Sequence, residues 1–299
     1  MQDLNWNDLR VFLAVARHGQ IGRAARALKM DPTTLGRRLK RLEENLERRL
    51  FERTREGQVL TEAGEDLLAR AEPMEHIARQ IEDERTPEQG LSGTLRLSVS
   101  EGFGSQFLAP RMADLAERHP QLTLELVASS GFLSPSRREA DIAVMLSRPK
   151  AGPVICRKLS DYRLKLYASA DYLARHGEPR SAAELARDHR LVSYVPDLLY
   201  APELNYLDDF HSGLSGHIRS SSINAQHRMV AAGAGVGVLP CFIADADRRL
   251  HAILPERRIE RTFWIVTHRD THKLARIVEG RRWLAAIVQA QRNVLLPPD

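Results

Sequence analysis

The stretch from Asp31 to Leu46 constrains the fold most, because it combines a strong helix start with two chemically different faces. Asp31 can accept hydrogen bonds from free backbone N–H groups, and Pro32 suits the first position of a helix. Apolar residues recur at helical spacing and form one stripe, namely Leu35, Leu39, Leu42 and Leu46. The opposite face carries hydroxyl and guanidinium groups, namely Thr33, Thr34, Arg37, Arg38 and Arg41.

That polar face has the chemistry of a helix that reads the major groove of DNA. Arginine can bond a guanine edge through two hydrogen bonds, and threonine can donate to a phosphate or contact a thymine methyl. An ordinary amphipathic helix with a solvated basic face shows the same pattern, so the neighbouring segments must decide between the two interpretations.

The segments on both sides favour a winged helix-turn-helix. A first helix with Leu9, Phe12, Leu13 and Ala16 on its apolar side ends at Gly19, and a short helix over 21–28 and a turn lead to Asp31. After residue 46, two short strands at 50–51 and 59–60 form a hairpin, the wing. These segments supply the remaining candidate DNA-binding residues, namely Gln20, Arg23, Arg53 and Arg55, and the two wing arginines are suited to the phosphate backbone or the minor groove.

The charge of the chain is distributed unevenly. The net charge is +5, and residues 1–60 contain 13 Lys and Arg against 8 Asp and Glu, so the whole excess lies there and the rest is neutral. This is expected when a module that binds a polyanion is joined to one that does not.

Five segments resemble the LysR-type transcriptional regulators, in the order and spacing of that family's N-terminal domain. They are Phe12-Leu-Ala-Val-Ala, Arg23-Ala-Ala-Arg-Ala-Leu, Leu39-Lys-Arg-Leu-Glu, Leu50-Phe-Glu-Arg and Leu60-Thr-Glu-Ala-Gly. The resemblance implies a sequence-specific DNA-binding domain over 1–60. The chain departs from the family's usual serines at 20–22 and at Gly36, so base preference cannot be carried over from relatives.

Residues 61–90 are predicted to form a linker helix and a hinge. Thr61 can cap the helix, and a seam follows at spacings of four and three, including Leu60, Leu67, Ala71, Met74, Ala78 and Ile81. Such a helix cannot bury this seam on its own small domain, so we expect a partner copy and a dimer, as the resemblance also implies. Packing against the chain's own C-terminal domain is the alternative. Pro73 predicts a kink or a helix in two pieces.

From residue 91 to 299, short apolar runs alternate with helical patterns, which is typical of an α/β domain with mostly parallel strands. Strands are expected at 95–99, 122–126, 142–146, 164–168, 191–195, 218–220, 236–239 and 263–267, and helices over 107–119 and 274–291. Two lobes around a cleft suit this length better than one sheet. The resemblance implies an effector domain like the type 2 periplasmic binding proteins, with lobe I at 91–162 plus 268–299 and lobe II at 163–267.

A hydroxyl-rich set is expected where the strands end at the cleft, and we predict that it binds the effector. Its members are Ser98, Ser100, Glu101, Ser129, Ser130, Ser147, Ser222 and Thr267. Ser100 and Ser222 each precede a predicted helix, so free N–H groups there could hold a carboxylate, although plain helix capping explains the serines equally well. Glu101 would repel an anion, so the charge of the ligand stays open, with an organic acid as one candidate.

No catalytic constellation, metal site or cofactor motif emerges. His268 and His272 have the spacing of a metal pair but no third ligand, and the glycines at 233–237 lead into a strand instead of opening a helix. We therefore predict a cytoplasmic regulator that is not an enzyme and has no membrane span. It binds double-stranded DNA and a small-molecule effector, acts as a homodimer or homotetramer, and contacts RNA polymerase. An enzyme or transport-related binding protein with the same two-lobed fold is the competing hypothesis.

Overall fold

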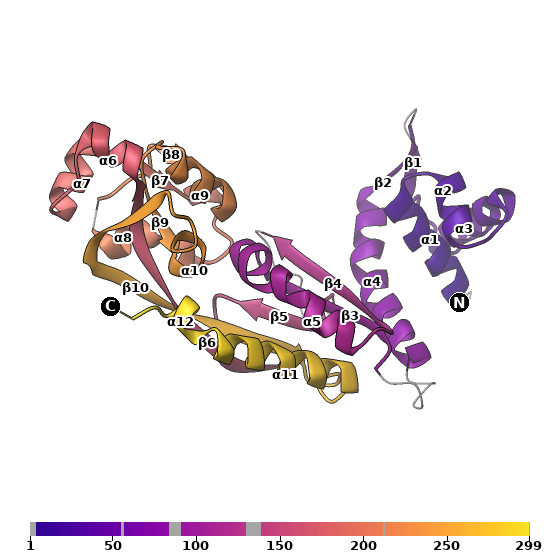
Figure 1. Ribbon diagram of the computed structural model, residues 1–299. Helices are drawn as coiled ribbons and strands as arrows, with labels where there is room; N and C mark the ends of the chain where they lie inside the picture. The colour runs from indigo at the N-terminus through magenta and orange to yellow at the C-terminus, as the bar shows by residue number, and fades with distance from the viewer. Residues whose placement is uncertain (1–3, 55–56, 84–90, 130–138, 212, 299) are drawn as a thin grey trace. The chain divides into compact units, whose positions relative to one another are not determined.

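The computed structural model describes residues 4–54, 57–83, 91–129, 139–211 and 213–298, and it divides into two units (Figure 1). The first unit is Met1–Thr86 and the second is Pro87–Asp299. The sequence analysis placed this boundary after residue 90.

The first unit consists of helices around a small core and one hairpin. Its elements are α1 (Trp6–His18), α2 (Ile21–Ala27), α3 (Pro32–Leu46), β1 (Phe51–Arg53), β2 (Gln58–Leu60) and α4 (Glu62–Asp83). Gly19 adopts a left-handed conformation, φ +65°, and ends α1 as predicted. The apolar stripe of α3 is buried against α1, with Leu35 facing Phe12 and Leu13 in one core cluster.

The hairpin of β1 and β2 is held against the turn between α1 and α2. Its strands are antiparallel and pair Phe51 with Leu60. The backbone N–H of Gln58 donates to the carbonyl oxygen of Gly19 at 2.7 Å. Gly57 has φ +145°, and a Cβ there would lie 2.2 Å from the same oxygen, so only glycine permits this approach.

Helix α4 is one continuous helix across Pro73, so the predicted division into two pieces is wrong. Thr61 caps it as expected, because its Oγ1 accepts from the N–H of Gly64 at 3.1 Å. Arg17 of α1 pairs with Glu75 of α4 at 2.5 Å, which fixes the two helices to each other.

The second unit is built on a single eight-stranded mixed sheet. Its strands are β3 (Gly93–Ser100), β4 (Leu122–Ser129), β5 (Ile142–Met145), β6 (Val154–Ser169), β7 (Leu191–Ser193), β8 (Ile218–Arg219), β9 (Val236–Pro240) and β10 (Leu250–His268). Their order is β4-β3-β5-β10-β6-β9-β7-β8. The two expected lobes are present, but the expectation that one sheet would not span them is wrong, since β6 and β10 run through both lobes (Figure 1).

The long strands also shift a predicted lobe boundary. Lobe I contains β3, β4 and β5, and lobe II contains β7, β8 and β9; strands are parallel within each lobe, and the crossing strands join them in antiparallel fashion. The segment Trp264–Thr267 of β10 pairs with β5. These residues thus belong to the sheet of lobe I, a few residues before the boundary predicted at 267/268.

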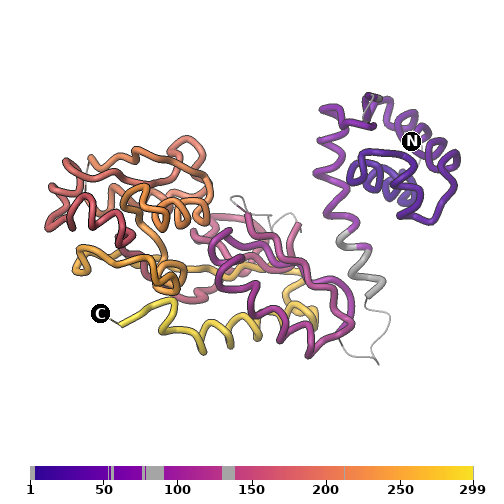
Figure 2. The backbone as a smooth tube through the Cα atoms, turned by 45° about the horizontal axis from the view of Figure 1, so that its top comes forward, coloured from indigo at the N-terminus to yellow at the C-terminus, as the bar shows by residue number. Residues whose placement is uncertain are grey.

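Helical segments cover the sheet. They are a π-helix over Phe103–Leu108, 3-10 turns at Ala109–Arg111, Pro196–Leu198 and Pro202–Leu204, and the α-helices α5 (Met112–Arg118), α6 (Ala170–His176), α7 (Ala182–Asp188), α8 (Tyr206–Phe210), α9 (Ile223–Ala231), α10 (Cys241–Ala244), α11 (Ala275–Ala290) and α12 (Arg292–Leu295). Helix α11 packs on β3, β5 and β6 and follows lobe I toward the C-terminus (Figure 2). Gly280 lets it approach, because a Cβ there would lie 2.8 Å from Leu95.

Aromatic rings fill the core where the lobes join. Phe103 and Phe107 stack with ring centroids 5.0 Å apart, and Tyr162 stacks on Phe263 at 4.1 Å. Phe242 of lobe II lies edge-on to Phe103 at 6.4 Å. Large buried rings of this kind contribute strongly to core stability, so the junction is packed and not hollow.

Candidate functional sites

The outward face of α3 is presented for contact with a partner. Asp31 caps the helix, its Oδ1 accepting from the N–H groups of Thr33 at 2.9 Å and Thr34 at 3.1 Å. Arg37 is exposed and Arg38 is half-buried. Among the residues that the structure describes, neither guanidinium has a hydrogen-bond or ion-pair partner, so both are available to bind an external acceptor.

Arg41 is engaged inside the unit. Its Nε and Nη2 donate to the two carboxylate oxygens of Asp8 at 2.8 and 2.6 Å, and this contact raises the pKa of Arg41. Asp8 is completely buried on α1. Its guanidinium thus neutralises a buried carboxylate and joins α3 to α1, a structural role that the sequence did not indicate beside the predicted contact with DNA.

Arg41→Ala should lower the midpoint of thermal unfolding of the first unit by several degrees, because it leaves the buried Asp8 carboxylate without its cation. DNA affinity of the folded protein should change less than about threefold, far less than loss of a bidentate base contact would cause. Circular dichroism melting and anisotropy at low temperature measure the two effects separately. An unchanged midpoint together with a large loss of affinity would make Arg41 a DNA contact.

The remaining candidate DNA-binding residues lie at the start of α2 and in the hairpin. Gln20 and Arg23 are exposed. The side chain of Arg53 and the whole of Arg55 lie outside the described residues. A methyl group at Gly36, on the outward side of α3, would meet no neighbouring atom within 4 Å, so packing inside the unit does not require glycine there.

The predicted seam of α4 is partly used within its own unit. Ala71 is completely buried, and Leu60 and Leu67 pack half-buried against the core of α1 and α3. The expectation that this unit could not bury the seam is thus wrong for its first half. Met74 remains 44% exposed, Ala78 is half-buried, and the side chain of Ile81 lies outside the described residues.

In the second unit, Glu101 occupies the helix end that the sequence suggested for an anion. Its carboxylate accepts from Ser222 Oγ at 2.8 Å, from the N–H of Ile223 at 3.1 Å and from Asn224 Nδ2 at 3.1 Å. Ser222 also caps α9, since its Oγ accepts from Ala225 N–H at 3.0 Å. Glu101 follows β3 in lobe I and α9 belongs to lobe II, so these bonds connect the lobes.

Three further polar contacts cross the junction. Asn224 Nδ2 donates to Ser105 Oγ at 2.9 Å, and Gln106 Nε2 donates to Asn224 Oδ1 at 3.1 Å. Ser147, after β5, donates to the carboxylate of Glu203 in lobe II. Asn224 and Glu203 were not among the predicted site residues: Asn224 lies in the first turn of α9 and Glu203 in a short 3-10 turn.

The other predicted effector-binding residues lie in different places. Ser100 and Ser129 pair with each other at the ends of β3 and β4, as expected, and Ser130 lies outside the described residues. Ser98 is completely buried within β3. Thr267 is also buried and pairs with Ile142, the first residue of β5. Because β10 runs antiparallel to β5, Thr267 lies at the N-terminal end of β5, level with Leu97 of β3 and not with Ser100.

The cavity at the junction is small and mostly aromatic. It measures about 20 Å³, and Ser100 is the one predicted effector residue among its described lining; the others include Phe103, Tyr194, Tyr200 and Tyr206. Burial, together with the nearby Glu101 carboxylate, raises the pKa of Tyr200 to about 12. These tyrosines are therefore protonated at neutral pH and can donate hydrogen bonds.

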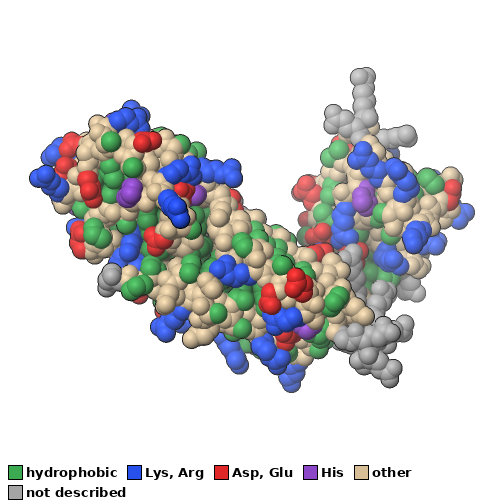
Figure 3. Space-filling model, viewed as in Figure 1, with side chains coloured by type: hydrophobic (Ala, Val, Ile, Leu, Met, Phe, Trp, Pro, Cys, Tyr) green, Lys and Arg blue, Asp and Glu red, His purple; other side chains and the backbone are tan. Residues whose placement is uncertain are grey.

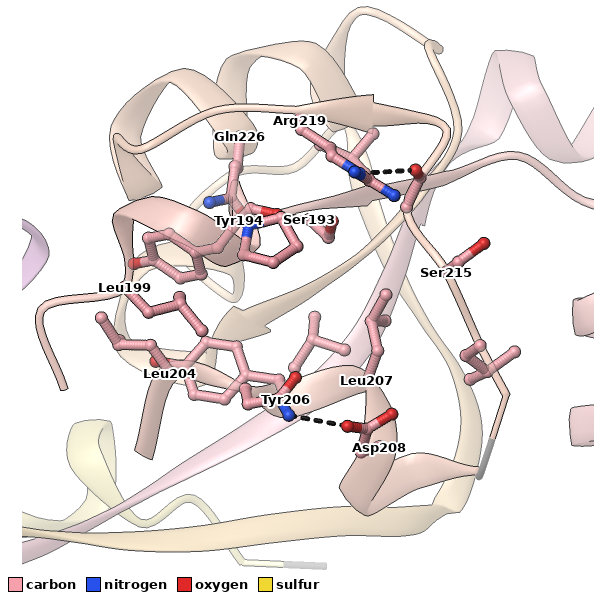
Figure 4. A pocket seen from close by; sticks show the side chains of 16 residues that line it. Ser193, Tyr194, Leu199, Leu204, Tyr206, Leu207, Asp208, Ser215, Arg219 and Gln226 are labelled. Carbon is pink, nitrogen blue, oxygen red and sulfur yellow. Dashed lines mark hydrogen bonds between the residues drawn. The ribbon is translucent and has the colours of Figure 1, made fainter. Parts of the chain in front are cut away.

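A larger pocket of about 250 Å³ lies within lobe II (Figure 4). Tyr194, Leu204 and Tyr206 line both this pocket and the junction cavity, so the two share a wall. In Figure 4 the tyrosines and leucines lie along one side, and Arg219 and Ser215 lie on the other. Gln226, one turn after Ser222 on α9, is buried at its edge, and its Nε2 donates to the Ser220 carbonyl at 3.0 Å.

The described residues contain no group of three or more His, Cys, Asp or Glu arranged to hold a metal ion. None of the described helices combines the length and apolar character needed to cross a membrane.

Comparison with known proteins agrees with both units. Residues 6–65 match the family "Bacterial regulatory helix-turn-helix protein, lysR family", and residues 88–289 match the "LysR substrate binding domain". The Mau operon transcriptional activator of Paracoccus denitrificans is 31% identical over 289 residues, which cover 94% of this chain and 96% of that protein. The HTH-type transcriptional regulator DmlR of Escherichia coli is 33% identical over 267 residues, 87% of each.

A solved structure shows the same architecture. CrgA, a LysR-type transcriptional regulator from Neisseria meningitidis, superposes with a TM-score of 0.56 at 29% identity, over 96% of this chain and 99% of that one. Family models match both parts of the chain, and the relatives match it over most of its length. The chain therefore belongs to the LysR family of bacterial transcriptional regulators.

Proposed function

We propose that α3 enters the major groove of an operator and that Arg37 and Arg38, together with Thr33 and Thr34, make the contacts that distinguish bases. The observation that carries this proposal is that neither guanidinium group has a partner in the described structure, whereas Arg41 is held by Asp8. Gln20 and Arg23 flank the reading helix, and Arg53 and Arg55 of the wing contact the phosphate backbone.

The linker helix α4 joins two copies through the part of its surface that its own unit leaves uncovered. Met74 is exposed there, while Ala71 is already buried. A homodimer, or a homotetramer built from two dimers, sets the spacing between reading helices and thereby the spacing of operator half-sites. We place this regulator in the cytoplasm, with RNA polymerase as its partner at the promoter, and we assign its units to residues 1–60, 61–90 and 91–299.

The effector is an organic acid whose carboxylate replaces that of Glu101 at the start of α9. Three donors already hold a carboxylate at this position, from Ser222, Ile223 and Asn224. The lobe II pocket accommodates the body of the ligand, because Gln226 and Ser222 lie one turn apart on the same side of α9. Displacing Glu101 breaks its contacts between the lobes, so the ligand favours a different arrangement of the domain.

Fluorescence anisotropy with DNA from upstream of the coding region, measured against a scrambled duplex over a salt series, tests operator reading. We expect a preference of at least about 1000-fold for the native fragment and a steep fall in affinity for both duplexes as salt rises. Equal and weak binding to both duplexes would show that α3 is a non-specific basic surface and does not read bases.

A further inference from the structure

A groove in lobe I, separate from the lobe junction, has five cationic side chains in its lining. It lies between the first half of β6 and the helices α11 and α12 and encloses about 720 Å³. In Figure 3 blue side chains gather along the lower edge of the second unit, where Figure 1 shows α11. Its charged lining residues are Arg157, Lys158, Asp161, Arg281, Arg282 and Arg292.

Five cations thus face a single carboxylate. Asp161 pairs with Lys158 at 2.5 Å and accepts from Thr262 at 2.6 Å, and Lys158 and Arg292 lower its pKa against the opposing effect of burial. Arg282 pairs with Glu279 outside the groove at 2.9 Å. Among the described residues, neither Arg157 nor Arg281 forms an ion pair, so no carboxylate neutralises these two charges.

Arg281 is held in an unfavourable environment. Burial and the charge of Arg157 lower its pKa. Its Nη2 donates to the carbonyl of His272 at 3.2 Å, whereas its Nε is buried and has no hydrogen-bond partner in the described structure. A buried donor without an acceptor and two neighbouring like charges both destabilise the fold, and an anion bound between them would relieve both.

We propose that this groove binds a small molecule with at least two negative charges, held by Arg157 and Arg281. The volume lies in the range of small-ligand sites, and Ile265, Val278 and Val288 supply an apolar floor beside the charged rim. Because the cations line a recess, a compact ligand fits them better than the extended backbone of a nucleic acid. Organic phosphates and polycarboxylates share the required chemistry.

Isothermal titration of the full-length protein with pyrophosphate and, separately, with citrate tests the site. Arg157→Gln and Arg281→Gln should each weaken binding at least tenfold. Arg187→Gln, which removes an exposed arginine of lobe II paired with Asp188, should leave binding unchanged. The Arg37→Gln/Arg38→Gln double variant should also bind normally, which separates this groove from the DNA-binding surface.

Stability without any anion provides a second measurement. Arg157→Gln should leave the thermal midpoint unchanged or raise it, because a like charge beside Arg281 is removed, and the rise caused by the anion should disappear. Binding of pyrophosphate alone identifies an organic-phosphate site, and binding of citrate alone a polycarboxylate site. Absence of binding by both, or loss of binding only in the Arg37/Arg38 variant, would overturn the proposal.

Discussion

Replacing Arg37 and Arg38 together by alanine should lower affinity for the operator at least about 100-fold, the largest effect expected of any surface substitution in this chain. A bidentate arginine–guanine contact contributes roughly 1–3 kcal/mol of discrimination, and a dimer loses two arginines from each reading helix. Affinity for a scrambled duplex should fall much less, because that binding depends on charge alone. Anisotropy titrations of both duplexes at one fixed salt concentration provide the comparison.

The matched control removes the same charge from the other end of the helix. Arg48 and Arg49 are exposed just beyond the C-terminal cap of α3 at Glu47. The Arg48→Ala/Arg49→Ala variant should lower affinity for both duplexes by a similar factor and retain the preference for the operator. If the two double variants behave alike, α3 contributes charge but does not read bases.

The first unit could be predicted closely because its signals are local. Asp31, Gly19 and Thr61 each fix a helix end within a few residues of themselves, and the structure has all three caps. The ion pair of Arg41 was missed for the opposite reason. Helical periodicity places it on the polar face, but its partner Asp8 lies 33 residues earlier and becomes its neighbour only when α1 and α3 pack.

The second unit was predicted less well where polar residues lie in strands. Strand β6 begins at Val154 instead of 164, and β10 at Leu250 instead of 263, because their first halves carry exposed charged residues that break the apolar pattern. Thr267 was placed at the cleft on the assumption of a parallel strand. The tyrosines of the junction were not predicted either. Tyr194, Tyr200 and Tyr206 lie in loops or at the end of a helix, where periodicity gives no indication.

The contacts of Glu101 explain why two features of the sequence pointed to opposite charges of the ligand. From the sequence, the carboxylate of Glu101 at the cleft argued against an anionic ligand, and the helix start after Ser222 argued for one. In the structure, both features belong to one interaction, since the carboxylate of Glu101 is itself the anion at α9. An external carboxylate therefore competes with Glu101 for the same donors.

Glu101→Ala should lower the free energy of unfolding of the second unit by about 2 kcal/mol, because it removes a charged acceptor from three donors that connect the lobes. Hydrogen exchange of the Ile223 amide should accelerate, whereas amides in the core of β3 should keep their protection. Glu101→Gln, which retains one acceptor oxygen, should lose less stability. Unchanged stability and unchanged exchange at Ile223 would contradict the assigned contact.

Acetate tests whether the donors at the start of α9 can bind an external carboxylate once the side chain of Glu101 is removed. In Glu101→Ala the donors of Ser222, Ile223 and Asn224 are free, so acetate should raise the thermal midpoint of this variant and slow exchange of the Ile223 amide again. The wild-type protein, whose donors are occupied, should not respond at the same ionic strength set with chloride. The Glu101→Ala/Ser222→Ala double variant should respond less, because one donor is missing. Equal responses of all three proteins would show that acetate acts elsewhere, and the effector would then bind without replacing Glu101.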